Sequence, residues 1–292
     1  MNRWIARFAL IPAAVVAFGM FVGCLLWTIA LSFTNSRLLP SYKWVGLAQY
    51  EKLFESSRWN ASVQNIVIFG VWYIVFCLVL GYILAVLLDQ KVRGESVLRT
   101  IYLSPQAMSL IVTGLVWAWF LNPDMGLQGF VRGLGWESFS FAWLASPTLA
   151  IYAVVIAAVW RGAGLVMILM LAGLRGVDQE MLKNLQVDGV PKWRVYAQVV
   201  PPMMTPMIIT SVVLLAAGVI NSYDIIVAMT RGGPGIATEV PGKFVMEHFF
   251  ARGDVGLATA GAAVMLGTLI LVAGPLLFIR WFMDRRRKGI AG

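Results

Sequence analysis

The chain has 292 residues, of which 60% are hydrophobic and 13% are charged. Soluble domains carry roughly a quarter charged residues, so this composition excludes a soluble globular protein and indicates an integral membrane protein. The net charge of +9 does not indicate a nucleic-acid partner, because the basic residues lie at the ends of apolar runs and form no face of their own.

The first apolar run covers residues of about 9–32, and Arg3 and Arg7 precede it. Basic residues before an apolar run are typical of signal peptides, but the apolar core of a cleavable signal has only about 7–15 residues. This run is longer and no small-residue cleavage site follows it, so it predicts an uncleaved transmembrane helix. The polar stretch 33–64 comes next and includes a short helix expected at the membrane interface.

Five more apolar runs follow, and each comes close to the roughly 20 residues that a helix needs to cross the hydrocarbon core. The chain is therefore predicted to be an all-α polytopic membrane protein with six transmembrane helices in a single domain, 1–292. Residues of about 65–283 form a predicted five-helix core bundle. The five runs cover residues of about 65–88, 106–121, 147–172, 206–229 and 259–283, and the third opens after Pro105.

Charge predicts the orientation, because cytoplasmic loops are enriched in Lys and Arg. With both termini inside, the inner segments hold 14 basic and 6 acidic residues, whereas the outer segments hold 8 basic and 7 acidic ones. This asymmetry predicts a multi-pass protein with both termini in the cytoplasm and with the loop 173–206 on the cytoplasmic side.

The loop 173–206 is a long polar interruption between two spans, and its pattern predicts two short helices. Asp188-Gly189 ends the first helix, because Gly suits the left-handed residue past a helix end, and Pro191 suits the first turn of the second. Pro201-Pro202 is expected to stop the second helix. The loop is then either a stiff knob that fits a cleft in a partner or an interfacial hairpin that only anchors its neighbours. Apolar residues recur at helical spacing at Met181, Leu182 and Leu185 in the first helix and at Trp193, Tyr196 and Val200 in the second.

Two ionisable residues fall inside predicted spans, Arg161 in the fourth and Asp224 in the fifth. A charged side chain in the membrane costs at least about 2.5–3.5 kcal/mol and usually faces a bundle interior or a cavity. The two residues are therefore expected to pair with each other or to line a polar path with Asn221, Ser222 and Tyr223. A pair that only fixes the register of the helices is the structural alternative.

Tryptophans near the spans have two interpretations. An aromatic face offers apolar contact to the C–H groups of a sugar ring, but membrane interfaces are also enriched in Trp. The positions concerned are Trp117, Trp119, Trp143 and Trp160.

The sequence contains no catalytic or metal-binding motif. It has no HExxH, no paired cysteines and no intramembrane Ser with a His to activate it, and Cys24 and Cys77 both fall inside apolar runs. It also has no GxxxxGK[ST] phosphate loop, so ATP would have to bind to another chain. After the fifth span, TRGGPGIATEVP predicts a sharp, rigid turn at the outer surface.

Two separated motifs carry a resemblance to a known family. WRGAGLVMILMLAGLRGVDQEMLKNLQVDGVPKWRVYAQVVPPMMTP (160–206) resembles the EAA-loop region of sugar ABC-importer permeases of the maltose-transporter type. SYDIIVAMTRGGPGIATEVP (222–241) is similar to the end of their penultimate core helix and the Gly-Gly-Pro loop that follows. LWTIALSF, TNSRLLPSYKWVGLAQYEKLF, LNPDMGL and AGLRGVDQ are most similar to the first permease subunit of bacterial glucose/mannose importers. The resemblance covers essentially the whole chain.

The resemblance implies a type I ABC-importer permease fold, in which the cytoplasmic loop forms coupling helices that insert into a groove of an ATPase subunit. That role would fall on Glu180, Lys183, Asp188, Gly189 and Pro201. The implied partners are a second homologous permease, an ATPase dimer that holds ATP and Mg, a periplasmic or extracellular sugar-binding protein, and membrane lipid. The implied location is the bacterial inner membrane, and no cofactor is expected on this chain.

The resemblance also marks positions along the path and at the outer face. Trp160 matches an aromatic residue near the middle of the fourth span, and Asp224 matches a position beside the translocation path. With Arg161, Asn221 and Tyr223 they make the candidate substrate path. The turn at the outer face falls on Gly232, Gly233 and Pro234.

Two departures from the family pattern concern the coupling loop. The Glu-Ala-Ala of the family falls on Lys183-Asn184-Leu185, and its Leu-Pro ending reads Val-Pro-Pro here. Glu180 lies three residues earlier, nearly on the same helix face, and is expected to supply the charge contact instead.

The implied function is the transmembrane permease subunit of an ATP-driven, binding-protein-dependent importer of a mono- or small oligosaccharide, of the glucose/mannose or α-glucoside type. An alternative is an ion-coupled secondary transporter in which Arg161 and Asp224 relay protons or ions, although internal repeats, which such folds often show, are not found. A membrane-embedded enzyme is a third interpretation, and the missing nucleophile and metal ligands disfavour it.

Overall fold

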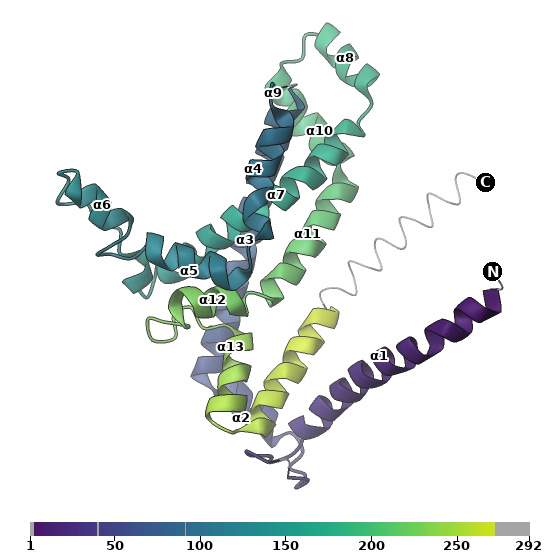
Figure 1. Ribbon diagram of the computed structural model, residues 1–292, viewed down its shortest axis with the longest axis vertical. Helices are drawn as coiled ribbons and strands as arrows, with labels where there is room; N and C mark the ends of the chain where they lie inside the picture. Colours follow the sequence, from purple (N-terminus) through teal and green to yellow (C-terminus); the bar gives the residue numbers. More distant parts are fainter. Residues whose placement is uncertain (1–2, 40, 91, 272–292) are drawn as a thin grey trace. The chain divides into compact units, whose positions relative to one another are not determined.

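The computed structural model describes residues 3–39, 41–90 and 92–271 (Figure 1). In this part of the chain the regular structure is helical, and extended pairing is limited to two isolated bridges. The fold is therefore all-α, as predicted. The chain divides into two compact units, one from the described parts of residues 1–60 and 241–292 and the other from those of 61–240.

Three helices are long and apolar enough to cross a membrane. They are α1 (Arg3–Ser32), α3 (Ser57–Asp89) and α7 (Ala150–Arg175). These helices contain or nearly coincide with the predicted spans 9–32, 65–88 and 147–172, so the three predictions are confirmed as helices. α3 begins eight residues before the expected start, because the polar residues ahead of Asn65 continue the helix.

The predicted span 106–121 is wrong as a single helix. The chain instead forms α4 (Glu95–Ala107) and α5 (Leu110–Phe120), whose axes bend by 98° across a short break. Pro105 does not open the span, since it lies inside α4. The break follows at Met108 and Ser109, where Ser109 has extended backbone and its hydroxyl caps α5 by accepting the N–H of Val112.

The predicted span 206–229 is likewise divided, into α11 (Thr205–Ile220) and a second helix that begins at Tyr223. A bend of 74° also separates α11 from the helical segment before it, Lys192–Met203. α11 ends at Ile220, where the side-chain amide of Asn221 donates to the Ala217 carbonyl, and α12 (Tyr223–Thr230) follows as a separate helix. Of the predicted span 259–283, the structure shows an apolar helix Val255–Leu271, and the rest lies outside the described residues.

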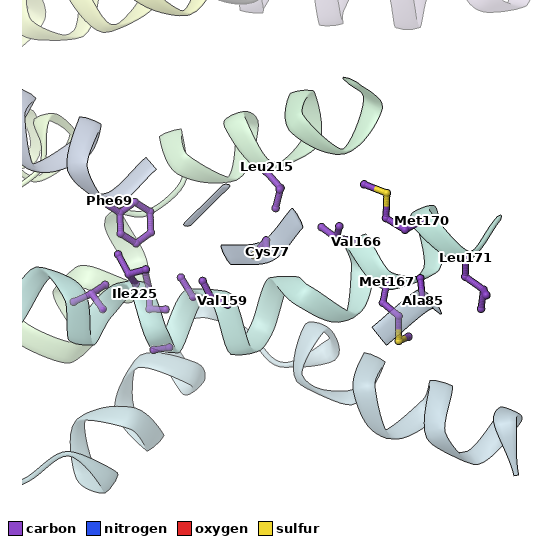
Figure 2. Packing of buried hydrophobic residues seen from close by; sticks show 14 of the residues in the cluster. Phe69, Cys77, Ala85, Val159, Val166, Met167, Met170, Leu171, Leu215 and Ile225 are labelled. Carbon is purple, nitrogen blue, oxygen red and sulfur yellow. The ribbon is translucent and has the colours of Figure 1, made fainter. Parts of the chain in front are cut away.

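The core of unit 61–240 forms around α7. In the most apolar stretch of α7, 67% of the residues are buried, against 22% in that of α3, so α7 is the central helix and α3 a peripheral one. Figure 2 shows buried side chains of α3, α7 and α11 gathered in one cluster that includes Cys77, Val159, Val166, Met170 and Leu215. With no solvent between membrane helices, such packing depends on close van der Waals contact.

Small residues on α7 allow neighbouring backbones to approach. A Cβ on Gly164 would lie 2.0 Å from the carbonyl oxygen of Tyr102, which shows how closely α4 crosses α7. On the α3 side, a Cβ on Gly81 would lie 2.6 Å from the Val166 side chain. Small residues at helix crossings are typical of membrane bundles.

The other unit has its own smaller core. It includes α2 (Ala48–Glu55), α13 (Pro241–Met246), the π-turn η3 (Glu247–Ala251) and the helix Val255–Leu271. The rings of Trp59 and Phe244 meet edge to face with centroids 5.2 Å apart, and Leu53, Leu257 and Ala260 complete the cluster.

A charge cluster lies beside this small core. The Glu247 carboxylate accepts hydrogen bonds from Arg58 Nη1 (2.6 Å), Lys243 Nζ (2.8 Å) and Arg252 Nη2 (3.1 Å). These donors, Arg58 first among them, hold the pKa of Glu247 well below its usual range. Separately, Lys52 pairs with Asp254 at 2.7 Å.

Candidate functional site

The first half of the loop 173–206 is the helix α8 (Gln179–Val187), which Figure 1 shows beyond the end of α7. The carboxylate of Asp178 accepts the N–H of Glu180 at 2.8 Å and so caps the start of α8. At the other end Gly189 has φ +76°, and the Val190 N–H bonds to the Leu185 carbonyl at 3.0 Å. This is a Schellman closure, and it confirms the left-handed residue that the sequence predicted at Gly189.

One face of this helix is packed and the other is exposed. Met181, Leu185 and Val190 pack against the core of unit 61–240, whereas Glu180 and Asp188 are exposed. The side chains of Leu182 and Lys183 lie outside the described residues. The interfacial-hairpin interpretation requires an apolar face turned to lipid, and here two of the three predicted apolar positions, Met181 and Leu185, pack inward instead.

The second half of the loop consists of α9 (Lys192–Arg194), the π-turn η2 (Val195–Val199) and α10 (Val200–Met203). The prediction that Pro201-Pro202 stops the helix is wrong, because the helix continues through both prolines to Met203. The preceding turn is widened, with the Val200 N–H bonded to the Val195 carbonyl five residues back. A single widened turn of this kind inside a helix is a π-bulge.

The predicted apolar stripe of the second helix is only partly correct. Val200 is buried and Tyr196 packs on the core, but Trp193 is 64% exposed with the Arg194 guanidinium 5.5 Å from its ring centroid. Trp193 is therefore part of a surface that we call the knob. The knob is the exposed set Val187, Asp188, Gly189, Pro191, Lys192, Trp193 and Arg194.

Two sets of contacts tie the loop to the membrane helices. The hydroxyl of Tyr82 in α3 donates to the Tyr196 carbonyl at 2.5 Å. At the end of α7, Arg175 contacts Glu95 of α4 at 2.7 Å and Asp89 of α3 at 3.6 Å. Three helices are thus joined at the base of the loop.

A cavity of about 190 Å³ lies in the same unit, and we call it the polar cavity after the polar side chains that line part of it. It brings together two of the predicted path residues, Arg161 and Asn221, together with Ser222. Tyr73 adds another polar group, and the remaining lining is Phe69, Leu110, Ala158, Gly218 and Ile225.

Arg161 is held by backbone carbonyls and not by Asp224. Its Nε donates to the Met108 carbonyl at 3.2 Å and its Nη2 to that of Gln106 at 3.4 Å. These carbonyls lie at the break between α4 and α5, where the helical hydrogen bonds end. Within the described ranges no ion pair joins Arg161 to Asp224, which is exposed, so the expected pair is wrong.

Ser222 gives the cavity an unused hydrogen-bonding group. The residue is 2% exposed, and its hydroxyl has no hydrogen-bond partner among the described residues. A buried hydroxyl without a partner is unfavourable, so a ligand or water that reaches it would be stabilised. Together with the Arg161 guanidinium and the Asn221 amide, it offers donors and acceptors suited to a ligand rich in hydroxyl groups.

The other predicted path residues lie elsewhere. Trp160 lines a separate apolar cavity of about 640 Å³, and its ring meets Trp117 edge to face at 5.9 Å. Tyr223 is half-buried and lines neither cavity. Trp119 is 73% exposed, and Trp143 stacks on Phe141 at 4.8 Å.

The turn after α12 is closed by hydrogen bonds, as a rigid loop requires. The Gly233 N–H bonds to the Thr230 carbonyl at 2.9 Å, and the Thr238 hydroxyl donates to the Gly233 carbonyl at 2.9 Å. Gly232 has φ +88°, a conformation that favours glycine, and Pro234 follows Gly233.

Sequence reasoning missed Tyr82 and the larger part of the cavity lining, namely Phe69, Tyr73, Leu110, Ala158, Gly218 and Ile225. Tyr73 lines the polar cavity and Tyr82 bonds to the loop. Both tyrosines interrupt the long apolar run of α3, and a hydroxyl inside a membrane span must find a partner within the protein. That signal was available in the sequence. Among the described residues, no group of three His, Cys, Asp or Glu side chains could hold a metal ion.

Comparison with known proteins identifies the family. Residues 77–288 match the family model described as binding-protein-dependent transport system inner membrane component. The chain is 36% identical over 272 residues to a probable ABC transporter permease protein of Pyrococcus horikoshii, covering 92% of this chain and 93% of that one. It is 29% identical over 259 residues to a xylose/arabinose import permease protein of Haloferax volcanii, covering 87% and 81%.

A solved structure shares the fold. A chain in the crystal structure of a bacterial ABC transporter involved in the import of the acidic polysaccharide alginate superposes with a TM-score of 0.80 at 18% identity, over 97% of this chain and 96% of that one. The fold is therefore that of a type I ABC-importer permease. The chain belongs to the family of binding-protein-dependent transport system inner membrane components, which are permeases and leave ATP hydrolysis to a separate subunit.

Proposed function

We propose that this chain is a permease subunit of an ATP-driven sugar importer and forms half of the translocation path together with a second homologous permease. The similarity to a xylose/arabinose import permease protein supports a sugar as the cargo. The polar cavity of Arg161, Asn221 and Ser222 supports it as well, since a sugar offers the hydroxyl groups that these side chains can bind.

The observation that carries the proposal is the knob. Its base is fixed, because Met181, Leu185 and Val190 pack on the core, while Asp188 and Gly189 stand exposed at the tip. Such a rigid projection can enter a groove of an ATPase dimer at the cytoplasmic face and transmit its motion as a body. Glu180 and Lys183 would flank this contact, and Pro201 lies where the loop rejoins the membrane helices.

The path is proposed to run past the polar cavity. Arg161 and Asn221 would contact the sugar there, with Trp160, Tyr223 and Asp224 at other points of the route. The sugar is proposed to be a mono- or small oligosaccharide of the glucose/mannose or α-glucoside type, on the sequence motifs alone.

The remaining partners follow from the same proposal. A periplasmic or extracellular sugar-binding protein would deliver cargo at the outer face, where the turn Gly232-Gly233-Pro234 is proposed to lie. Both termini would be cytoplasmic, ATP and Mg would be held by the ATPase subunits, and the chain would act as one transmembrane domain with membrane lipid around it.

Mild-detergent purification of the tagged chain tests the assembly, and two knob variants test the coupling. Recovery of an ATPase and a second permease is expected. In proteoliposomes with the binding protein, Asp188→Lys and Gly189→Val are expected to abolish sugar-stimulated ATPase activity, since one reverses the charge at the tip and the other forces a side chain into a left-handed conformation.

A charge-matched control separates a local effect from a general one. Asp124→Lys makes the same change at an exposed carboxylate outside the loop and is expected to behave as wild type. Normal stimulated activity in both knob variants would exclude this coupling role, and uptake without any companion ATPase would exclude the function itself.

A further inference from the structure

The segment that leads from the knob into the membrane contains a carbonyl that its own helix cannot satisfy. The Tyr196 carbonyl would ordinarily accept the N–H of residue 200 or, in a π-turn, of residue 201. The Val200 N–H is bonded to Val195 instead, and Pro201 has no N–H to give. Both of the helix's own donors are thus removed at one position.

A side chain from another helix takes their place. The Tyr82 hydroxyl of α3 donates to the Tyr196 carbonyl at 2.5 Å. Tyr82 and Tyr196 are both half-buried against the core of this unit, so water competes poorly for the carbonyl and the bond is stronger than one at a surface.

We propose that Tyr82 is a positioning residue that ties the coupling segment 192–203 to α3, so that displacement of the knob moves α3. This rests on the proposed function, because the displacement is the one that the ATPase would impose. Without the hydroxyl, the segment would keep its helical form but lose the side-chain hydrogen bond that joins it to α3. The knob could then move while α3 stayed behind.

Three variants isolate this bond. Tyr82→Phe removes the hydroxyl and keeps the ring. Tyr82→Phe combined with Pro201→Ala restores a backbone N–H next to the orphaned carbonyl and makes the hydroxyl unnecessary. Tyr102→Phe is the matched control, since Tyr102 packs on the same core and its hydroxyl has no hydrogen-bond partner in the part of the chain that the structure describes.

Hydrogen exchange on the purified full chain measures the tether without any partner. In Tyr82→Phe, amides of residues 192–203 are expected to exchange roughly tenfold faster, the factor for one buried hydrogen bond. The double variant and Tyr102→Phe are expected to stay within about twofold of wild type. Unchanged exchange in Tyr82→Phe, or equally fast exchange in the double variant, would overturn the proposal.

Transport in the reconstituted complex tests the mechanical consequence. Tyr82→Phe is expected to retain sugar-stimulated ATPase activity but to import less sugar for each ATP hydrolysed. An unchanged ratio would show that the tether, even if present, does not move α3. If the wild-type chain recovers no ATPase, the proposed function fails, and the exchange measurement still decides whether the tether exists.

Discussion

The two bent helix pairs of unit 61–240 are held in different ways. Where α4 and α5 bend by 98°, the support is backbone and charge: the Tyr102 carbonyl lies directly against Gly164, and Arg161 holds the carbonyls of the break. Where the segment 192–203 and α11 bend by 74°, the atoms nearest to a Cβ on Gly173 would belong to the side chains of Met204 and Met207.

The difference separates a fixed region from an adaptable one. Backbone carbonyls cannot move without shifting a whole helix, whereas methionine side chains readily change rotamer. The first bend borders the polar cavity and keeps its shape. The second bend leads to the knob, so we expect it to be the one that yields when force is applied there.

A pair of glycine substitutions gives the largest expected contrast. Gly164→Ala places a methyl group 2.0 Å from the Tyr102 carbonyl oxygen and is expected to lower the free energy of unfolding by about 3 kcal/mol, at the upper end of overpacking costs. Gly173→Ala places a methyl group 2.8 Å from the Met207 Cγ, a side-chain atom that gives way more easily than a backbone carbonyl, and is expected to cost less, about 1–2 kcal/mol.

Thermal unfolding of both variants in the same detergent measures this contrast. Both changes add one methyl group to the same helix, so helix propensity and hydrophobicity cancel between them. Equal destabilisation would show that the two bends are equally rigid and would remove the basis of the comparison.

Removing the charge at the first bend should act on that bend alone. Arg161→Met leaves the Gln106 and Met108 carbonyls without their donor, which is expected to cost about 2 kcal/mol. Hydrogen exchange should then accelerate at residues 104–112 and stay unchanged at 192–203. Arg161→Lys keeps the charge but loses the planar guanidinium. Its exchange rate at residues 104–112 should therefore lie between those of wild type and Arg161→Met. Acceleration at both segments would mean that the bends are not independent.

A substitution in the charge cluster around Glu247 has the smallest expected effect on stability. It also serves as a reference for the substitutions at the two bends, because it lies in the other unit. Glu247→Gln is expected to cost about 1 kcal/mol near neutral pH, without any change in exchange at 104–112 or 192–203. The pKa of Glu247 is lowered from its usual value of 4.5. Its stabilisation is therefore complete above about pH 4.5 and is lost as the pH falls through the lowered pKa.

Measuring the free energy of unfolding at several pH values checks the direction of this pH dependence. Wild type should lose stability below about pH 4.5 more steeply than Glu247→Gln, because the variant has no carboxylate to protonate. Parallel curves would show that the cluster does not contribute.

The long helices could be predicted from the sequence and the bends could not. Hydropathy located α1, α3 and α7 because each is a continuous apolar run. It missed the break at Met108 because Pro105, the obvious breaker, is accommodated within α4. It missed the end of α11 because nothing in a uniformly apolar run shows that the amide of Asn221 turns back to the Ala217 carbonyl.

The candidate site could be predicted only where local sequence determines the structure. Local chemistry identified the left-handed turn at Gly189, since a single residue type determines it. Of the two alternatives for Arg161, the ion pair with Asp224 was wrong, because a charge inside a span calls for compensation without saying what supplies it. Here the compensation comes from carbonyls that exist only because a helix is broken. The role of Tyr82 likewise requires knowing which helix lies beside Pro201.

The bond between Arg161 and the broken helix also bears on how the protein is made. Chains emerge from the ribosome N-terminus first, so Gln106 and Met108 reach the bilayer before Arg161, which follows 53 residues after Met108. The acceptors are in place when the guanidinium arrives, and it need not wait in lipid at a penalty of about 2.5–3.5 kcal/mol. During membrane insertion, the break between α4 and α5 therefore supplies hydrogen-bond acceptors before the Arg161 side chain needs them.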